Sequence, residues 1–507
     1  MADIINHWIM NTLLPILTLP TPVIEPKEST SQPTLKLDRR TYDRALSCVH
    51  CGLCLPACPT YLQTGHEAEG PRGRIQLMRG LSDGNIEPTR KVREHLDSCL
   101  NCRGCETACP SGVVYHELIE ETRDRLSRHD QENPPAFASN RGVLRWFVRN
   151  VVAHPNRLRA SVLPVRLLQR SGLYRVLERF RVMELLPPAM RKMERMLPES
   201  GPVWPRPLPR FTGAKGMDAV LVALQNAALM GQNGVARRPA GARDTRKIVG
   251  FFAGCVGSIF YDRTNRQAIE ILAACGVDVY APPQQGCCGA LHKHGGGMDQ
   301  ARELARRNID LFLPRDGTAV DYIVTNIGGC GSTMLEYDVL LRDDPEYASL
   351  AREFRRRYRD ISQMLAELPL PKMAHRVNLT AAYHDACHLA HAQRVRAVPR
   401  ELLSRIEGLK LVPLAENDLC CGAAGTYNLE NPKMADELAN RKLDHLAAAK
   451  AQVLIAGNAG CASHLAAQAK ARGQKLRVVH PVELIHQAIF GKPEIRNQND
   501  ESNPKPE

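Results

Sequence analysis

The sequence contains no apolar run long enough to span a membrane as a helix. Residues 8–24 carry no charge, but three prolines interrupt a stretch that is already shorter than a spanning helix needs. No basic segment precedes this stretch, as a secretory signal would require, because the first lysine is Lys27. We expect residues 1–35 to form a mobile N-terminal extension that contacts a partner or a membrane surface.

Several catalytic and nucleotide-binding motifs are also missing. The chain has no G-x-G-x-x-G loop after a predicted strand and no Walker A loop, so it should not bind a flavin dinucleotide or ATP itself. No Ser-His-Asp arrangement is legible, which fits a subunit without its own substrate site. Basic residues exceed acidic ones by 13, with much of the excess in residues 141–246. Without a zinc-finger or RNA-binding signature, this charge indicates a solvated face or a protein partner and no nucleic acid.

Cysteine is the informative residue type. The chain has 17 cysteines, and 16 of them fall into patterned groups. Disulfides suit small secreted domains, whereas this chain has 507 residues and no secretory signal. We therefore expect the cysteines to bind metal ions or clusters in a reducing compartment, which predicts a cytoplasmic protein.

Two cysteine runs near the N-terminus share the spacing C-x2-C-x2-C-x3-C-P. In bacterial ferredoxins each such run wraps three corners of one [4Fe–4S] cube and sends its fourth cysteine to the other cube. A zinc site or a disulfide knot fits this staggered spacing poorly. The spacing predicts two [4Fe–4S] clusters, one bound by Cys48, Cys51, Cys54 and Cys109, and the other by Cys99, Cys102, Cys105 and Cys58.

The segment between the two runs is too long for the loop of a minimal ferredoxin. It has 40 residues, and we expect helices within it at residues 75–81 and 92–96. Arg72 and Arg74 lie between the first run and these helices. They either approach the clusters, where a cation would raise the reduction potential, or lie on a solvated turn.

The region of residues 246–490 contains an internal duplication. Phe251-Phe-Ala-Gly-Cys resembles Tyr383-His-Asp-Ala-Cys, and a Cys-Cys-Gly-Ala segment begins at Cys287 and again at Cys420. A third pair of segments ends at Cys330 and Cys461. The three matches recur after 132, 133 and 131 residues, and offsets that agree so closely indicate a repeat.

Each repeat is predicted to be α/β. In the first repeat, residues 248–252, 277–280 and 322–326 are short apolar runs typical of buried strands. Residues 265–275 have helical periodicity that ends at Gly276, a suitable cap. The patterned cysteines then lie just after a strand or on the loop between a strand and a helix, where open α/β sheets gather their sites.

The two repeats hold a second set of candidate metal ligands. Each brings one cysteine, a Cys-Cys pair and a further cysteine: Cys255, Cys287, Cys288 and Cys330, and then Cys387, Cys420, Cys421 and Cys461. Four soft thiolates suit an iron–sulfur cluster or zinc, and adjacent cysteines also permit a thiol–disulfide role. Cys275 lies outside both patterns and is interpreted as a core residue.

The paired ferredoxin runs followed by two Cys-Cys-Gly halves resemble the cysteine-rich (CCG) domain family, which includes heterodisulfide reductase subunits. The chain is more closely similar to the iron–sulfur subunits of bacterial glycolate oxidases, also called glycolate dehydrogenases. The similarity spans about residues 40–490. It is carried by Cys48-Val-His-Cys-Gly-Leu-Cys, Gly70-Pro-Arg-Gly-Arg-Ile, Asp97-Ser-Cys-Leu-Asn-Cys, Ala305-Arg-Arg-Asn-Ile-Asp, Gly329-Cys-Gly with Glu336-Tyr, and Leu419-Cys-Cys-Gly-Ala-Ala-Gly-Thr-Tyr.

The resemblance implies an electron-transfer subunit of an oxidoreductase complex. In that family FAD-binding partner subunits oxidise glycolate, and this chain would pass the electrons through its two [4Fe–4S] clusters to a quinone or another acceptor. Such a complex would be cytoplasmic or peripherally associated with the inner membrane. Assemblies that oxidise lactate or glycerol 3-phosphate share this layout, and a heterodisulfide reductase-like thiol/disulfide oxidoreductase is a further alternative.

One departure from the family pattern concerns the repeats. Heterodisulfide-reductase-type halves carry a fifth cysteine three residues after the fourth, and here Thr333 and His464 occupy those positions. Their presence argues against five-thiolate, noncubane clusters. His464 is either a ligand or a core or surface histidine. The remaining alternatives for the repeats are a third iron–sulfur cluster, zinc or no metal.

The expected fold class combines α+β and α/β domains. An α-helical, ferredoxin-like domain with two [4Fe–4S] clusters is followed by two tandem α/β CCG repeats. The expected boundaries are the extension at residues 1–35, the two-cluster domain at 36–128, a basic helical linker at 129–245, the repeats at 246–370 and 371–490, and a disordered tail at 491–507.

Overall fold

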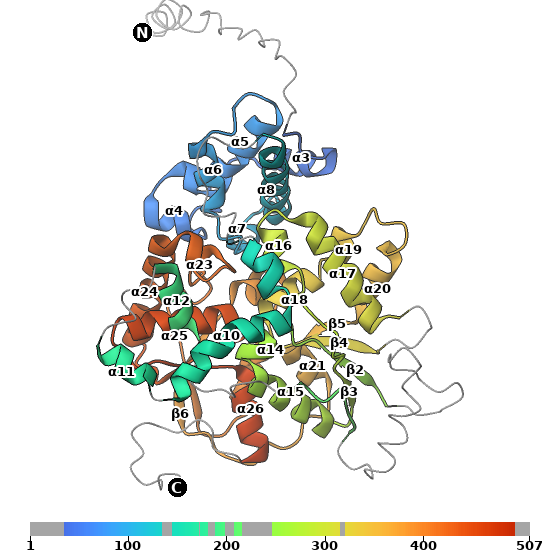
Figure 1. Cartoon of the computed structure of the whole chain (residues 1–507), viewed down its shortest axis with the longest axis vertical. Coiled ribbons are helices and arrows are strands. Elements are labelled where there is room, and N and C mark those ends of the chain that lie inside the picture. Colours follow the sequence, from blue (N-terminus) through green and yellow to red (C-terminus); the bar gives the residue numbers. More distant parts are fainter. Residues whose placement is uncertain are drawn as a thin grey trace, which may run out of the picture. The chain divides into compact units, whose positions relative to one another are not determined.

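The structure is a computed structural model, shown in Figure 1. It describes residues 35–133, 144, 146–171, 173–180, 188–197, 207–214, 246–314 and 320–491. Apart from Leu35 and Gly491, the predicted mobile extension and the predicted disordered tail lie outside these residues. No helix in the described part of the chain is both long and apolar enough to cross a membrane.

Helices, without strands, make up residues 35–133. They are α3 (Arg39–Leu46), α4 (Pro59–Thr64), η1 (Glu67–Glu69), α5 (Pro71–Ser82), α6 (Arg90–Asp97), α7 (Gly104–Thr107) and α8 (Tyr115–Glu132). Pro59 opens α4 directly after Cys58, at a helical position where a missing N–H costs nothing. Helices α5 and α6 confirm the two predicted at residues 75–81 and 92–96. Helix α8 continues past the boundary predicted at residue 128.

The first repeat contains a five-stranded sheet in the order β1-β3-β2-β4-β5. Its strands are β1 (Phe211–Thr212), β2 (Ile248–Phe251), β3 (Asp278–Tyr280), β4 (Tyr322–Thr325) and β5 (Tyr358–Asp360). All neighbours pair in parallel except β1, which pairs antiparallel with β3. The helices are α14 (Gly257–Phe260), α15 (Asp262–Ala274), α16 (Ala290–His294), α17 (Met298–Phe312), α18 (Gly328–Met334), α19 (Tyr337–Leu340), α20 (Ala348–Arg357) and α21 (Ile361–Glu367).

These bounds confirm the three strands and the helix predicted for the first repeat. Helix α15 gives way to Gly276, whose φ of +83° places it in the left-handed region that glycine tolerates best. Cys275 caps the helix and is buried in the core, as expected.

The second repeat contains a four-stranded parallel sheet in the order β7-β6-β8-β9. Its strands are β6 (Leu379–His384), β7 (Leu409–Val412), β8 (Val453–Ala456) and β9 (Arg477–Val479). Its helices are η4 (His388–Ala392), α22 (Ala397–Ser404), α23 (Tyr427–Glu430), α24 (Pro432–Ala448), α25 (Ala459–Ala471) and α26 (Pro481–Phe490). Without β1, the first sheet has the same order, so the topology confirms the duplication.

Each sheet reverses its winding direction beside its first strand. In the first repeat β3 lies on one side of β2 and β4 on the other, and β7 and β8 flank β6 in the same way. Ligands of open α/β sheets bind outside the carboxyl ends of the strands at this switch point. Cys255 follows β2 and Cys387 follows β6, so both sets of repeat cysteines begin at a switch point.

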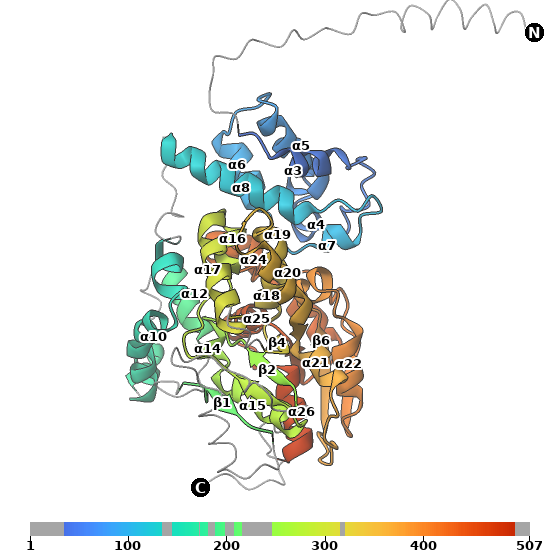
Figure 2. The ribbon, with the colours of Figure 1, turned by 90° about the vertical axis from the view of Figure 1, so that its right-hand side faces the viewer.

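The two repeats share one core. A single buried apolar cluster includes Phe251 and Leu272 from the first repeat and Tyr383, Leu402 and Leu484 from the second. Helix α26 packs against α15, and α21 packs against α22 (Figure 2). The last helix of each repeat thus packs against the other repeat. Much of the apolar surface of each repeat is therefore buried only when both repeats fold.

The described helices between residues 144 and 197 contact both repeats. They are η2 (Val148–Val152), α10 (Pro155–Arg170), α11 (Leu173–Arg179) and α12 (Pro188–Met196). Helix η2 packs against α16, α10 packs against α14, and α12 packs against α25 of the second repeat. This linker therefore bridges the two repeats.

His480 ties the second repeat to the first through a neutral imidazole. It is 2% exposed, its Nδ1 accepts the N–H of Val482 at the start of α26, and its Nε2 donates to the carbonyl of Asn326 at 2.9 Å. Burial lowers the pKa of His480 from 6.5 to about 4. Protonation of Nδ1 would remove the cap of α26.

We predict that His480 makes the protein less stable as the pH becomes acidic. Between pH 6.5 and about 4 the unfolded chain binds the proton more readily, so stability falls as the pH falls through this window. The shift corresponds to about 3 kcal/mol. The asparagine in His480→Asn can cap α26 but cannot titrate. In urea titrations, the free energy of unfolding of this variant should therefore fall by about 2–3 kcal/mol less than that of the wild type between neutral pH and the pKa of His480 in the folded protein. Equal losses in the two proteins would contradict this assignment.

Candidate metal centres

The structure brings the last cysteine of the first run together with three cysteines of the second. Cys58, Cys99, Cys102 and Cys105 all line one small cavity. Three of them are buried, and Cys102 is partly buried. This grouping is the crossover that the spacing predicts, and the assignment of the four as ligands stays a prediction.

Polar groups around this cavity suit an iron–sulfur cluster. The backbone N–H of Asn101 and the hydroxyl of Tyr115 donate to Cys99 Sγ at 3.4 and 3.7 Å. The guanidinium of Arg74, which is 1% exposed, lies 4.0 Å from Cys58 Sγ. Hydrogen bonds to sulfur and nearby positive charge both tune cluster potentials. Arg74 therefore lies beside a predicted ligand and not on a solvated turn.

The electrostatics of the grouped thiols also fit a cluster. Burial raises the pKa of both Cys102 and Cys105 well above the ordinary range, and neighbouring thiols raise it further. Four thiols in such surroundings cannot ionise together unless positive charge lies between them. The iron of a [4Fe–4S] cluster supplies that charge, so the residues present fit this group.

The cysteines of the other predicted cluster lie closer to the surface. Cys51 is exposed, while Cys48, Cys54 and Cys109 are partly buried and pack against the helical core of residues 35–133. Burial raises the pKa of Cys54 to about 11.

Arg72 holds the loop of the first run in place. Its guanidinium donates to the carbonyl of His50 at 2.9 Å and pairs with Glu67 at 2.6 Å. A side chain at Gly52, which has a φ of +85°, would meet this guanidinium at 2.9 Å. The close fit explains why glycine occupies the position between two cysteines of the run.

The four patterned cysteines of the first repeat form one connected group. The thiol of Cys287 interacts with those of Cys255 and Cys288, and the thiol of Cys288 interacts with that of Cys330. Cys255 and Cys288 hold the pKa of Cys287 well below its ordinary value. The same contacts, with burial, raise the pKa of Cys255 and Cys288.

The second repeat repeats this arrangement and adds a histidine. The thiol of Cys420 interacts with those of Cys387 and Cys421, and the thiol of Cys421 interacts with that of Cys461. Cys420 and Cys461, followed by the nearby His384, hold the pKa of Cys421 well below its ordinary value. The structure therefore gathers each set of four cysteines that the sequence grouped.

Two of the eight repeat cysteines lie in helices and not in loops. Cys330 is in the first turn of α18, and Cys461 is in the first turn of α25. The expected position was after a strand or on a loop, but these helices begin almost directly after β4 and β8. The first turn of a helix stabilises a thiolate, because the N–H groups there have no partner within the helix and carry partial positive charge.

The two repeat sites have different surroundings. After burial, the thiol of Cys387 is the neighbour that most raises the pKa of Cys102, a predicted cluster ligand. Cys102, Cys387 and Cys420 pack in one apolar cluster with Leu100 and Tyr427. In the first repeat Cys255 and Cys287 instead pack with Ala153, next to η2. The second-repeat site therefore adjoins the predicted cluster, and the first-repeat site adjoins the linker.

A buried ionic network joins the helical region to the first repeat. Lys293 Nζ lies 3.0 Å from Glu120 and 2.5 Å from Glu336, and Arg103 and His116 also pair with Glu336. Burial alone would lower the pKa of Lys293, but the two carboxylates raise it. Burial alone would raise the pKa of Glu336, but His116, Lys293 and Arg103 lower it. The network is thus charged and fixes Arg103, the residue that follows Cys102.

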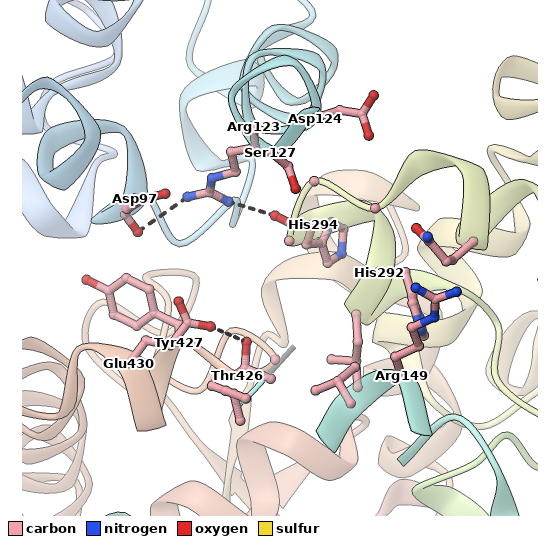
Figure 3. A pocket seen from close by; sticks show the side chains of 18 of the residues that line it. Asp97, Arg123, Asp124, Ser127, Arg149, His292, His294, Thr426, Tyr427 and Glu430 are labelled. Carbon is pink, nitrogen blue, oxygen red and sulfur yellow. Dashed lines mark hydrogen bonds between the residues drawn. The ribbon is translucent and has the colours of Figure 1, made fainter. Parts of the chain in front are cut away.

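A cavity of about 710 Å³ opens beside the second cysteine run. Figure 3 shows Arg123 reaching from α8 to the carbonyl of His294, with Tyr427 on another wall. The Tyr427 hydroxyl, His294 Nε2 and Asn101 Oδ1 have no hydrogen-bond partner in the structure. Cys99 and Leu100 also line the cavity. Its size and its polar lining suit a small-molecule ligand.

Three protein families match the chain in sequence order. The 4Fe-4S dicluster domain matches residues 44–113, and the cysteine-rich domain matches residues 249–335 and 381–466. Between them, the linker region of the glycolate oxidase iron-sulfur subunit matches residues 140–197. The matches confirm the predicted fold class of a two-cluster domain followed by two CCG repeats.

Two relatives are similar along nearly their whole length. The probable glycolate oxidase iron-sulfur subunit of Bacillus subtilis (strain 168) is 34% identical over 460 residues, which are 90% of this chain and 96% of that protein. The glycolate oxidase iron-sulfur subunit of Escherichia coli (strain K12) is 33% identical over 443 residues, 87% and 94% of the two chains. The chain belongs to the glycolate oxidase iron–sulfur subunit family.

Members of a related group are shorter. The lactate utilization protein A of Shouchella clausii (strain KSM-K16) is 29% identical over 239 residues, which are 47% of this chain and 98% of that protein.

As a glycolate oxidase iron–sulfur subunit family member with a 4Fe-4S dicluster domain, the present chain carries two [4Fe–4S] clusters and transfers electrons as part of an oxidoreductase complex.

The sequence patterns did not identify three residues that lie beside the metal centres of this protein. The imidazole of His292 lies beside Cys287, that of His384 lies beside Cys421, and Lys293 lies at the centre of the ionic network. Aligning the two repeats could have singled out His384, which takes the place of Phe252. His464, the histidine that the sequence did single out, contacts the carbonyl of Ala435 through Nε2 at 3.2 Å.

We predict that Lys293→Met destabilises the fold by about 3–5 kcal/mol, because it leaves two buried carboxylates short of their shared cation. Urea unfolding monitored by circular dichroism measures the loss. Arg342→Met is the control, since Arg342 pairs with Asp38 at 3.1 Å where both are partly exposed, and it should cost less than about 1 kcal/mol. Similar losses in the two variants would show that the network does not stabilise the fold.

Proposed function

We propose that this chain is the electron-transfer subunit of a flavin-dependent glycolate oxidase complex. In this proposal FAD-binding partner subunits oxidise glycolate, and the present chain conducts the electrons to a quinone or another acceptor. The observation that carries the proposal is the gathering of Cys58 with Cys99, Cys102 and Cys105 around one cavity. The similarity to two glycolate oxidase iron-sulfur subunits supports the choice of substrate.

The proposed ligand sets follow the crossover of the two runs. Cys48, Cys51, Cys54 and Cys109 would hold one cluster, and Cys99, Cys102, Cys105 and Cys58 the other. When bound, each [4Fe–4S] cluster accepts and releases one electron at a time. The protein orients the second set through the donors to Cys99 and places Arg74 beside Cys58. Both contacts favour the more negatively charged, reduced state.

The loop of the first run is the proposed entry point for electrons. Cys51 is exposed, and the large apolar side chains of Leu46, Val49 and Leu53 in the same segment are 49%, 68% and 58% exposed. Exposed apolar side chains close to a redox centre are typical of a surface that docks a partner protein. We assign this segment to the contact with a flavin-binding subunit.

The cavity beside the second run is the proposed exit. Cys99, Leu100 and Asn101 form one of its walls, so an acceptor bound there would lie next to a predicted ligand. Polar side chains that line the cavity, those of Arg123, Thr426 and Tyr427, could bind the carbonyl oxygens of a quinone. The 17 free thiols support a reducing, cytoplasmic setting, with the complex at the inner membrane surface if the acceptor is a membrane quinone.

Replacing one ligand of each proposed cluster tests the assignment. Cys51→Ser and Cys102→Ser should each lose about four of about eight iron atoms, and each should abolish glycolate-dependent dye reduction by the assembled complex. Iron and sulfide analysis of anaerobically prepared protein measures the loss. Cys275→Ala is the matched control, because Cys275 is a buried cysteine that caps α15 outside every patterned group. A full iron content in either serine variant would refute the ligand assignment.

The proposed acceptor site has its own test. Tyr427→Phe removes one hydroxyl from the cavity, and losing one hydrogen bond of about 1–2 kcal/mol should raise the KM for a soluble quinone roughly 5–30-fold. The iron content should stay unchanged. Tyr322→Phe, on β4 and outside the cavity, is the control. An unchanged KM in Tyr427→Phe would remove the cavity from the electron path but would leave the cluster assignment intact.

A further inference from the structure

His384 is a buried histidine without a hydrogen-bond partner. It is the last residue of β6, and its side chain is fully buried at 0% exposure. Both ring nitrogens, Nδ1 and Nε2, lack a conventional hydrogen-bond partner in the structure. Buried imidazoles are normally held by such bonds, so two unpartnered nitrogens at one buried ring point to a ligand.

Two cysteines lie close to this imidazole. One ligand atom each from His384, Cys421 and Cys461 all lie within 4.8 Å of one another, and all three residues are buried. Within the described part of the chain, this is the one group of three or more His, Cys, Asp or Glu side chains that comes so close together.

The spacing of these atoms is close to that of ligands around a single ion. A zinc–sulfur bond is about 2.3 Å and a zinc–nitrogen bond about 2.0–2.1 Å, so the ligand atoms of one tetrahedral zinc ion lie about 3.6–3.8 Å apart, and three atoms within 4.8 Å of one another need to move by only about 1 Å to bind an ion. Imidazole and thiolate are also the ligands that structural zinc sites use. The sequence of the second repeat brings them to one point from β6, from the loop before Gly422 and from α25.

Adjacent thiols can complete a tetrahedral set. Cys387 follows His384 by three residues after β6, and its thiol interacts with that of Cys420, which in turn lies beside Cys421. Cys387 also lies near Cys461. A third thiolate from the Cys387–Cys420 pair would give the His-Cys₃ composition of a closed structural zinc site.

We propose that the second repeat holds one zinc ion, bound by His384, Cys421, Cys461 and a thiolate of the Cys387–Cys420 pair. Zinc has no redox chemistry, so the role of this ion is to fix the strand-end loops. The next residues along the chain contact the second cysteine run: His388 Nε2 lies 3.0 Å from the carbonyl of Asn101, and His391 Nδ1 lies 2.9 Å from the hydroxyl of Thr107. The ion would therefore support the loop that carries Cys102.

The first repeat lacks this site. Phe252 takes the place of His384 directly after β2, and its ring packs in the core against Phe312. The four cysteines of the first repeat have no imidazole from this position, and the nearby His292 comes from α16 instead. The proposed zinc ion therefore belongs to the second repeat alone, although the cysteines of the two repeats have nearly the same spacing.

Metal analysis of the full-length chain tests the proposal. Zinc and iron per chain are measured by mass spectrometry after anaerobic purification, and zinc-edge X-ray absorption reports the bound atoms. The wild type should contain about one zinc ion, with one imidazole nitrogen at about 2.0 Å and three sulfurs at about 2.3 Å. His384→Phe, which copies the first repeat, should lose at least about nine-tenths of the zinc and keep its iron.

Two further variants separate ligation from folding. His384→Cys supplies another zinc ligand at the same position and should retain the ion, whereas misfolding at this position would remove zinc from both His384 variants. His464→Gln changes another buried histidine of the repeat and should also retain zinc. A wild type without zinc, iron in place of zinc at this site, or undiminished zinc in His384→Phe would each overturn the proposal. These outcomes leave the two ferredoxin-type clusters untouched, because zinc and iron are counted separately.

Discussion

The dominant physical constraint on this protein is that thiolates repel one another when they are gathered away from water. Burial raises the pKa of Cys102 and Cys105, and contact among cysteines raises that of Cys255, Cys288, Cys420 and Cys461. Such groups become stable anions only around positive charge, which iron–sulfur clusters and metal ions provide. Metal binding should therefore stabilise the folded chain, because only the folded state gathers these thiols.

The duplication supplied two equivalent switch points, but packing made them different. The second-repeat site lies against the loop of Cys102, while the first-repeat site lies next to η2 of the linker. At the carboxyl end of the first strand, the second repeat has His384 where the first repeat has Phe252. The shared core keeps the repeats together as one body, so each site could diverge while the framework stayed the same.

The ionic network around Lys293 complements this arrangement on the side of the first repeat. It joins α8 to α16 and Glu336, and its member Arg103 follows Cys102 directly. Contacts from both repeats therefore converge on the second cysteine run, with Lys293 and Glu336 on one side and His388 and His391 on the other. Electron transfer requires a fixed geometry between centres, and these buried contacts restrict the motion of the loop that sets it.

The sequence by itself determined the local features of this protein. The spacing of the two runs predicts the clusters, three matching offsets predict the repeat, and short apolar runs with Gly276 predict the elements of the first repeat. Each is a property of neighbouring residues or of a fixed period, so it can be found without knowing the packing. Cys330 and Cys461 were predicted to follow a strand or to lie on a loop, but both lie in helices, because almost no loop separates these helices from the preceding strands.

Only the tertiary structure decided which distant groups meet. It placed Arg74 beside Cys58, Lys293 between Glu120 and Glu336, and His384 beside Cys421 and Cys461. These contacts join residues far apart in the chain, and their energies come from burial, which no local pattern reports. An arginine, a lysine or a histidine in the sequence is compatible with a solvated surface, and it becomes a site residue only when packing removes it from water.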